Sequence, residues 1–368
     1  MTEPLPARNS EKKASHPVRL FCIALLLALL AALPAVSARG AEQLYTYKEP
    51  HMGIEFTIRS WAEEGQVADL TLVTREAFAR IAALNRSLSD YLPESEINAL
   101  AKAPSDLAFP VSGDLFALFE TAGQLTAETD GAFDITAGPI IRLWRMGRKN
   151  RALPTADQIA SAKARTGFHH LVLDREKRTI LKKIDGMLFD LGGIAKGYAA
   201  DAALSILKEG GFPRSLVAAS GDIVVGDAPP GEPGWKIGIE TLEIGHDLKD
   251  LETVTLVNAA ISTSGDTRRY LELDGVRYSH IVSTRTGLGL TERIGASVIG
   301  PGATTSDSYA TAVVLLGTKE GLQFIENKRG IECQIVALRD GREVFTHSDG
   351  FLQFQGTNHQ KESPVAAP

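Results

Sequence analysis

The stretch DLGGIAKGYAAD, residues 190–201, joins an apolar run to a predicted helix through two adjacent glycines and a lysine. Gly192 and Gly193 allow the backbone to approach a ligand without side-chain obstruction. The N-terminus of the following helix favours an anion at the same place, and Lys196 adds a positive charge. The stretch is therefore either a phosphate-binding turn or a tight structural turn, and its residues alone leave both interpretations open.

The spacing of these residues excludes two common nucleotide-binding motifs. A P-loop needs a Lys-Ser/Thr pair, whereas Lys196 is followed by Gly197. The glycine spacing is not that of a Rossmann fingerprint either. Elsewhere, helical and strand patterns mix without a regular strand–helix–strand rhythm. This favours an α+β fold, one domain with mixed, largely antiparallel sheets packed by helices, over a doubly wound parallel sheet.

Apolar periodicity and capping residues predict the helices. Apolar side chains recur at helical spacing over residues 66–87. Ser112 and Thr155 are suited to cap two further helices, the second through a capping box with Gln158. The helix that contains Lys196 should end near Gly210-Gly211. Two more helices are predicted at 305–316, with Thr305 as its cap, and at 318–328.

Strand signals are concentrated after residue 170. The dipeptides Asp274-Gly275 and Asp340-Gly341 are typical of tight hairpin turns. Short apolar or alternating runs predict the remaining strands. These strands are expected at 171–173, 179–181, 187–189, 216–219, 223–225, 235–239, 253–256, 270–273, 276–282, 295–299 and 331–338.

Composition and the cysteines limit the possible functions. The chain has 368 residues, 44% of them hydrophobic and 23% charged, with a formal net charge of −6. This balance offers no basic excess for nucleic acid or an anionic membrane surface. Only Cys22 and Cys333 are present. Cys333 lies in an apolar run that we interpret as a buried strand, so we expect a core residue and not a nucleophile.

The N-terminus has the pattern of a secretory signal. Lys12, Lys13 and Arg19 precede an apolar run at 20–33, and small residues follow it. We therefore expect a signal peptide over residues 1–38, cleaved after Ala38, and a protein exported to the periplasm. An uncleaved inner-membrane anchor is the alternative. Residues 39–357 should form a single domain, and the polar tail 358–368 should be disordered.

Two further stretches carry candidate functional groups. Asp307 and Thr311 are four residues apart in a predicted helix and so share one face. Their oxygens are hard ligands of the kind that Mg²⁺ takes alongside substrate phosphates, although the helix dipole alone also favours an acid there. His280 precedes a polar loop and could act as a base near neutral pH, or could be structural.

Six stretches of the chain, taken in their order along the sequence, resemble the ApbE family of flavin transferases. Smaller matches are His51-Met-Gly53, Ser220-Gly-Asp222 and Trp235-Lys-Ile-Gly238, and the resemblance runs from about Tyr47 to Phe354. No single motif identifies the family, but the occurrence of all of them in one order along the chain is specific. The six stretches are 88–97, 131–136, 190–201, 260–266, 280–287 and 304–311.

The resemblance implies an activity and a set of site residues. Members of the family transfer FMN from FAD to a threonine or serine hydroxyl of an acceptor protein, and AMP leaves. By resemblance, Mg²⁺ is held by Gly193, Asp307 and Thr311, and His280 is the base that acts on the acceptor hydroxyl. The residues matched to FAD contacts are Met52, Tyr91, Ala132, Phe133, Asp134, Asp190, Lys196 and Ile281.

The resemblance also implies partners and leaves alternatives. We expect FAD as substrate and an exported or membrane-bound acceptor with a Ser/Thr-Gly-Ala-Ser/Thr-like motif. The nearest internal string is Pro301-Gly-Ala-Thr304, in which proline replaces the first hydroxyl residue, so self-modification is not expected. The same site could instead serve a Mg²⁺-dependent FAD pyrophosphatase that yields FMN and AMP. A non-catalytic flavin-binding protein is the other alternative.

Overall fold

The computed structural model describes Met1 and residues 40–242, 252–265 and 270–355, and those from Glu42 onward fall in one compact unit. Most of the predicted signal peptide, the predicted tail and Asp266 lie outside the described residues. Within the described part, no helix has the length and apolar character needed to cross a bilayer.

An eight-stranded sheet forms the centre of this unit, and every neighbouring pair in it is antiparallel. The strand order is β1-β2-β6-β7-β10-β13-β14-β15. The predicted α+β class with antiparallel sheets is therefore confirmed. The strands are β1 (Gln43–His51), β2 (Ile54–Ala62), β6 (Ser215–Ala219), β7 (Asp222–Val225), β10 (Ala259–Gly265), β13 (Ile294–Gly300), β14 (Glu332–Arg339) and β15 (Arg342–His347).

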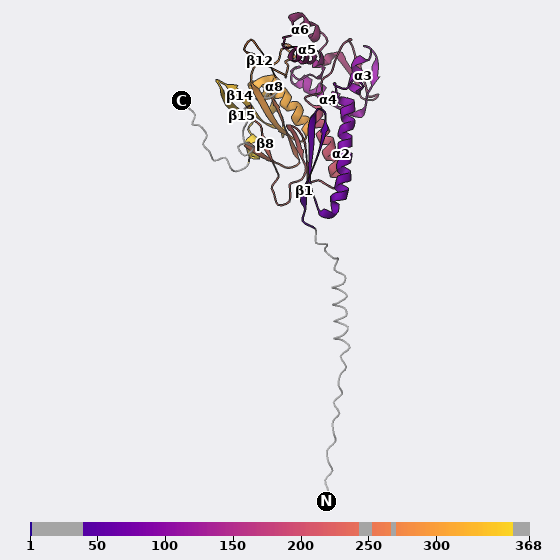
Figure 1. Cartoon of the computed structure of the whole chain (residues 1–368), viewed down its shortest axis with the longest axis vertical. Coiled ribbons are helices and arrows are strands. Elements are labelled where there is room, and N and C mark those ends of the chain that lie inside the picture. Colours follow the sequence, from indigo (N-terminus) through magenta and orange to yellow (C-terminus); the bar gives the residue numbers. More distant parts are fainter. Residues whose placement is uncertain (2–39, 243–251, 266–269, 356–368) are drawn as a thin grey trace. The chain divides into compact units, whose positions relative to one another are not determined.

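Three long helices cover one face of this sheet: α2 (Val67–Leu88), α7 (Ala195–Glu209) and α8 (Ala303–Glu326). Helix α7 packs on β6 and β7, α8 packs on β10 and β13, and α2 packs on α7. Figure 1 shows α2 alongside β1 and α8 alongside β14. Because strand side chains alternate between faces, Val217, Val224 and Ala260 point into this helical layer and belong to the largest apolar core.

The opposite face of the sheet is covered by a hairpin. Strands β8 (Trp235–Ile239) and β9 (Glu252–Leu256) pair with each other, and their apolar side chains pack against Leu216 and Ile261. Both faces of the central strands are therefore buried. This explains why Ile294–Gly300 is buried at every position.

A long insertion separates two neighbouring strands, β2 and β6, and a second hairpin lies near the end of β10 in sequence. The insertion contains α2 and continues through α3 (Glu96–Lys102), β3 (Ala108–Pro110), α4 (Gly113–Glu128), α5 (Gly138–Asn150), α6 (Ala156–Lys163), β4 (Leu171–Asp174), β5 (Thr179–Lys182) and α7. The second hairpin is β11 (Tyr270–Leu273) with β12 (Val276–Ser279), and short 3₁₀ turns lie at Glu64–Gln66, Ile135–Ala137, Phe168–His170 and Phe351–Phe354.

The helix caps predicted at Ser112 and Thr155 are confirmed. The Ser112 hydroxyl accepts a hydrogen bond from the Leu115 amide at 3.2 Å, at the start of α4. At the start of α6, the backbone amide of Gln158 donates to the Thr155 hydroxyl, and the backbone amide of Thr155 donates to the side-chain oxygen of Gln158. These bonds satisfy amide groups that have no partner within the helix.

One predicted strand, one predicted strand end and one predicted helix cap are wrong. Residues 187–189 are not a strand, although Met187 and Phe189 are buried; the run passes directly over Gly138, where a Cβ would lie 2.5 Å from the Leu188 carbonyl oxygen. Strand β12 ends at Ser279, so His280 follows the strand instead of belonging to it. Helix α8 is capped by Gly302, not by Thr305.

The interruption between the last two predicted helices is confirmed. Gly317 has φ 81° and ψ 175°, which breaks the helical backbone inside Ala303–Glu326. A left-handed φ of this kind is accessible to glycine at little cost. The hairpins at Asp274-Gly275 and Asp340-Gly341 are also present, and all four residues have positive φ.

Cys333 is expected not to react with Ellman's reagent in the native protein. It is fully buried in β14, and burial raises the pKa of its thiol to about 12, so almost no thiolate exists near neutral pH. The measurement is thiol titration of a Cys22→Ser variant before and after denaturation. Rapid reaction without denaturant would contradict the assignment of Cys333 to the core.

Candidate functional site

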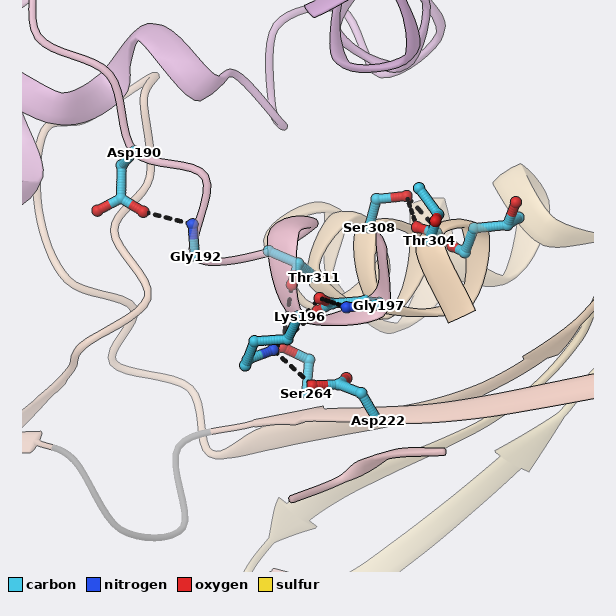
Figure 2. Close-up of polar contacts among 11 residues, drawn as sticks. Asp190, Gly192, Lys196, Gly197, Asp222, Ser264, Thr304, Ser308 and Thr311 are labelled. Atoms are coloured by element: carbon cyan, nitrogen blue, oxygen red, sulfur yellow. Dashed lines mark hydrogen bonds and ion pairs between the residues drawn. The ribbon is translucent and has the colours of Figure 1, made fainter. Parts of the chain in front are cut away.

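Lys196 lies at the centre of a buried cluster in which two carboxylates face one ammonium group. It is in the first turn of α7, directly after the glycine turn. Its Nζ is 2.5 Å from Oδ2 of Asp222 and 3.2 Å from Oδ1 of Asp307. Figure 2 shows the Lys196 side chain directed toward Asp222, with a dashed line joining the two. The structure thus brings together the lysine of residues 190–201 and the acid of residues 304–311.

The local fold explains how the three residues meet. Asp222 is the first residue of β7, and its side chain points to the helical face, as do those of Ser262 and Ser264 on β10. Asp307 approaches from α8 and accepts a hydrogen bond from the Gly197 amide at 3.1 Å. The helices come this close because residue 197 has no side chain. A Cβ there would lie 2.1 Å from the Ala303 carbonyl oxygen.

Replacing Gly197 with alanine is expected to lower the free energy of unfolding by about 3 kcal/mol, at the upper end for an overpacked core. The obstacle is the backbone of α8, which cannot rotate away as a side chain could. Urea denaturation measures the change. Gly65→Ala is the control, since a Cβ there meets no atom within 4 Å. Equal stability of both variants would contradict the close contact of α7 and α8.

The cluster holds more negative than positive charge. Asp222 and Asp307 are only 4% and 3% exposed. Burial is the main cause that raises the pKa of Asp307 to about 7; Asp222 adds to the rise, and Lys196 opposes it. Burial lowers the pKa of Lys196, but the two carboxylates outweigh this and raise it above its usual range. When both acids are ionised, one negative charge remains uncompensated, which favours an additional cation.

Oxygen atoms suited to a hard cation lie beside this excess charge. Thr311 is one helical turn after Asp307, and a Cβ on Gly193 would lie 2.9 Å from its hydroxyl. The Ser264 hydroxyl is 3.3 Å from the same oxygen. The described residues contain no group of three His, Cys, Asp or Glu that could hold a metal. One carboxylate with hydroxyl and carbonyl oxygens is instead a donor set that fits Mg²⁺, which keeps several waters and takes substrate phosphates.

Asp201, the last residue of the opening stretch, holds the start of α8. Its carboxylate accepts hydrogen bonds from the amides of Ala303 and Thr304, at 2.7 and 2.8 Å, and from the Thr304 hydroxyl at 2.6 Å. An acid at a helix N-terminus satisfies free amides and the helix dipole together. Residues 190–201 therefore contact α8 through Gly197 and Asp201, and pass close to it at Gly193.

A second charged group lies on the other side of the glycine turn. Arg145 on α5 forms ion pairs with Asp90 and with Asp190, the latter at 2.5 Å. Its guanidinium carbon also lies 4.4 Å from the centroid of the Tyr91 ring. Asp190 accepts a hydrogen bond from the Gly192 amide at 2.8 Å, shown in Figure 2. Tyr91 and Asp190, both matched to FAD contacts, are therefore joined by one arginine.

The Ala132–Asp134 turn and the loop after His280 lie against each other. Ala132 and Phe133 are buried, and the Asp134 carboxylate accepts hydrogen bonds from Thr136 and from the Phe168 amide. The Thr284 hydroxyl donates to the Gly131 carbonyl at 2.7 Å. A pocket of about 690 Å³ opens beside this junction, lined in part by Gly131, Asp134 and Thr284, and not by Lys196 or Asp307.

The two remaining matched residues have different surroundings. Met52 forms the two-residue turn between β1 and β2 with Gly53, at φ 50° and 74°, and packs partly against the core. A left-handed methionine is uncommon. Ile281 is buried in the same apolar cluster as Ala310 and Val313 of α8. His280, half-buried, therefore adjoins a residue packed in the cluster that includes α8.

Three residues at the site were not assigned a role from the sequence. In the sequence, Asp222 directly follows Ser220-Gly221, which indicates a turn but no role. The pairing of β7 with β10 is what brings its side chain beneath α7. Ser264 was visible in a run of hydroxyl residues after an apolar strand. Arg145 left no signal, because an arginine on an amphipathic helix is expected to be solvated.

One protein family and several of its members match most of this chain. The model described as "ApbE family" matches residues 52–335. An FAD:protein FMN transferase from Vibrio cholerae is 31% identical over 314 residues, 84% of this chain and 92% of the relative. An FAD:protein FMN transferase from Salmonella typhimurium is 33% identical over 248 residues, which are 66% of this chain and 70% of the relative.

Solved structures of the same kind share the fold. The flavin transferase ApbE from Vibrio cholerae has a TM-score of 0.77 at 27% identity, covering 85% of this chain and 100% of that one. The Pseudomonas stutzeri flavinyl transferase ApbE, in its apo form, has a TM-score of 0.75 at 28% identity, with 85% and 97% covered.

Proposed function

This chain belongs to the ApbE family, and we propose from this that it is an FAD:protein FMN transferase that depends on Mg²⁺. It would move FMN from FAD to a threonine or serine hydroxyl of an acceptor protein, with release of AMP. The observation that carries the proposal is the buried cluster around Lys196. Its uncompensated negative charge and its neighbouring hydroxyls suit a hard cation, and its lysine suits a pyrophosphate.

The residues of the cluster fit the demands of phosphoryl transfer. This chemistry requires positioning and neutralisation of charge more than covalent participation of the protein. Asp307, Thr311 and the Gly193 carbonyl would hold Mg²⁺, which supplies charge neutralisation at the phosphates when bound. Lys196, held by Asp222, adds a fixed positive charge at the N-terminus of α7.

His280 is proposed as the base that removes the proton of the acceptor hydroxyl. An alcohol is a poor nucleophile near neutral pH, and a positioned base contributes about 10²–10⁴-fold to such a reaction. The hydroxyl of Thr304, in the nearest internal match to the acceptor motif, already donates to Asp201. This supports an acceptor on another protein, and the resemblance to the family suggests that this acceptor carries a Ser/Thr-Gly-Ala-Ser/Thr-like motif.

We also propose that the protein is exported to the periplasm. The support is the sequence of residues 1–38, in which basic residues, an apolar run and small residues follow each other. The acceptor would then be an exported or membrane-bound protein. Cell fractionation with detection of the processed N-terminus tests this part of the proposal.

A reconstitution tests the activity. The purified protein is mixed with FAD, Mg²⁺ and an FMN-binding domain that carries the acceptor motif, and the acceptor is analysed by intact mass spectrometry. Addition of one FMN, absent with EDTA and absent when the acceptor hydroxyl is removed, would support the transferase. Free FMN and AMP without modified acceptor would favour the pyrophosphatase, and unaltered FAD would contradict both activities.

A further inference from the structure

We propose that Arg145 is a positioning residue that holds the Tyr91 ring as a platform for a planar ring of FAD, at a set place relative to the glycine turn. The inference rests on the proposed function, since it names how the substrate of that same site is held. Arg145 belongs to none of the motifs by which the family was identified. Its contacts within the described residues carry the proposal.

The first observation is that Tyr91 is exposed but held in place. The residue is 69% exposed, so it does not serve the core. The Arg145 guanidinium nevertheless lies over the ring, 4.4 Å from its centroid, in a cation–π arrangement. An exposed aromatic ring that is fixed beforehand binds a flat ligand at a lower entropic cost than a mobile one.

The second observation is that the backbone around Tyr91 is fixed independently. The Asn98 side chain donates to the carbonyl oxygens of Asp90 and Leu92, at 3.0 and 2.8 Å. Asp90 also pairs with Arg145. The carbonyls on both sides of the tyrosine and one neighbouring side chain are thus anchored, which leaves the rotation of the Tyr91 side chain for Arg145 to restrict.

The third observation is the link from this ring to the anion-binding turn. The other end of the Arg145 fork pairs with Asp190 at 2.5 Å, and Asp190 accepts from the Gly192 amide. The arginine side chain is only 28% exposed, and it bridges two carboxylates. Such a bridge has the directional geometry that only a planar guanidinium supplies. Arg145 therefore sets the place of the ring relative to the turn proposed to bind the pyrophosphate.

The test compares FAD affinity with turnover. Arg145→Gln should weaken FAD binding roughly tenfold, a change equivalent to about 1.4 kcal/mol, while kcat at saturating FAD stays within a few-fold. Tyr91→Ala should weaken binding to a similar degree. Because the two side chains act as one unit, the double variant should bind little worse than either single variant. Affinity is measured by FAD fluorescence titration and the acceptor reaction by mass spectrometry.

Two further variants complete the design. Arg142→Gln removes the same charge from an exposed position on the same helix and should leave FAD affinity unchanged. Arg145→Lys keeps the charge but loses the planar fork, so it should not restore wild-type affinity. If Arg145→Lys restores wild-type affinity, Arg145 acts only through its charge. If the effects of the Arg145 and Tyr91 substitutions simply add, the two side chains act independently. Either result would overturn the proposal that Arg145 holds the Tyr91 ring.

The inference and the proposed function fail in different ways. Wild-type protein that binds no FAD would overturn the proposed function, and the inference with it. Wild-type protein that binds FAD, together with a folded Arg145→Gln variant of equal affinity, would overturn the inference alone. If Arg145→Gln does not fold, Tyr91→Leu decides, because the exposed Tyr91 contributes little to the core. Unchanged affinity in that variant would overturn the platform.

Discussion

Replacing Asp307 with alanine is expected to abolish Mg²⁺-dependent turnover and to leave the fold intact. Loss of the only carboxylate of the proposed cation site should reduce the rate by roughly 10³-fold or more, since a bound metal ion contributes several kcal/mol to transition-state stabilisation. The fold should tolerate the change because Lys196 keeps its 2.5 Å contact with Asp222. The substitution also removes a carboxylate whose ionisation burial opposes.

The measurements for Asp307→Ala are turnover over a range of Mg²⁺ concentrations and thermal unfolding by circular dichroism. Glu320→Ala is the matched control, an exposed acid of α8 that lies beyond the break at Gly317 and outside the cluster. It should retain turnover and its dependence on Mg²⁺. Full activity of Asp307→Ala, or its failure to fold, would refute the assignment of Asp307 as a metal ligand.

Replacing His280 with alanine is expected to preserve FAD binding and to lose FMN transfer, by roughly 10²–10⁴-fold. His280 follows β12 at the start of a loop tied to the Gly131 turn through Thr284 and to α5 through the Trp144 side chain. Because the loop has these anchors and the neighbouring Ile281 is buried, removal of the imidazole should leave its backbone in place.

The decisive comparison for His280→Ala is between two quantities, FAD affinity by fluorescence titration and the rate of acceptor modification. His347→Ala serves as the control, a histidine on the edge strand β15. A collapse of FAD affinity in His280→Ala would make His280 a binding residue, and an unchanged rate of transfer would exclude it as the base.

Much of the fold could be predicted because its signals are local. The Ser112 and Thr155 caps and the Asp274-Gly275 turn each depend on residues within a few positions of each other. The prediction failed where tertiary packing decided the outcome. The apolar run at 187–189 resembles a strand by composition, yet it is buried by packing over Gly138 without pairing in any described sheet.

The site was predictable only in part, for a similar reason. Asp307 and Thr311 could be placed on one helical face because their spacing is local. Asp222 meets Lys196 across 26 residues, and Arg145 meets Asp190 across 45. Contacts over such separations depend on the order of strands and the docking of helices, and one sequence carries no periodic signal for either.

The insertion between β2 and β6 has a consequence for how the protein folds during synthesis. Neighbouring strands of one sheet are separated by residues 63–214, and Lys196 meets Asp307 only 111 positions later. A nascent chain that ends before α8 has the lysine and the glycine turn but lacks both proposed metal ligands on that helix. Long-range pairing of this kind is completed late in folding. Competence to bind Mg²⁺ and FAD together should therefore arise only after α8 has been synthesised and has packed against α7, so that shorter chains do not capture the substrate.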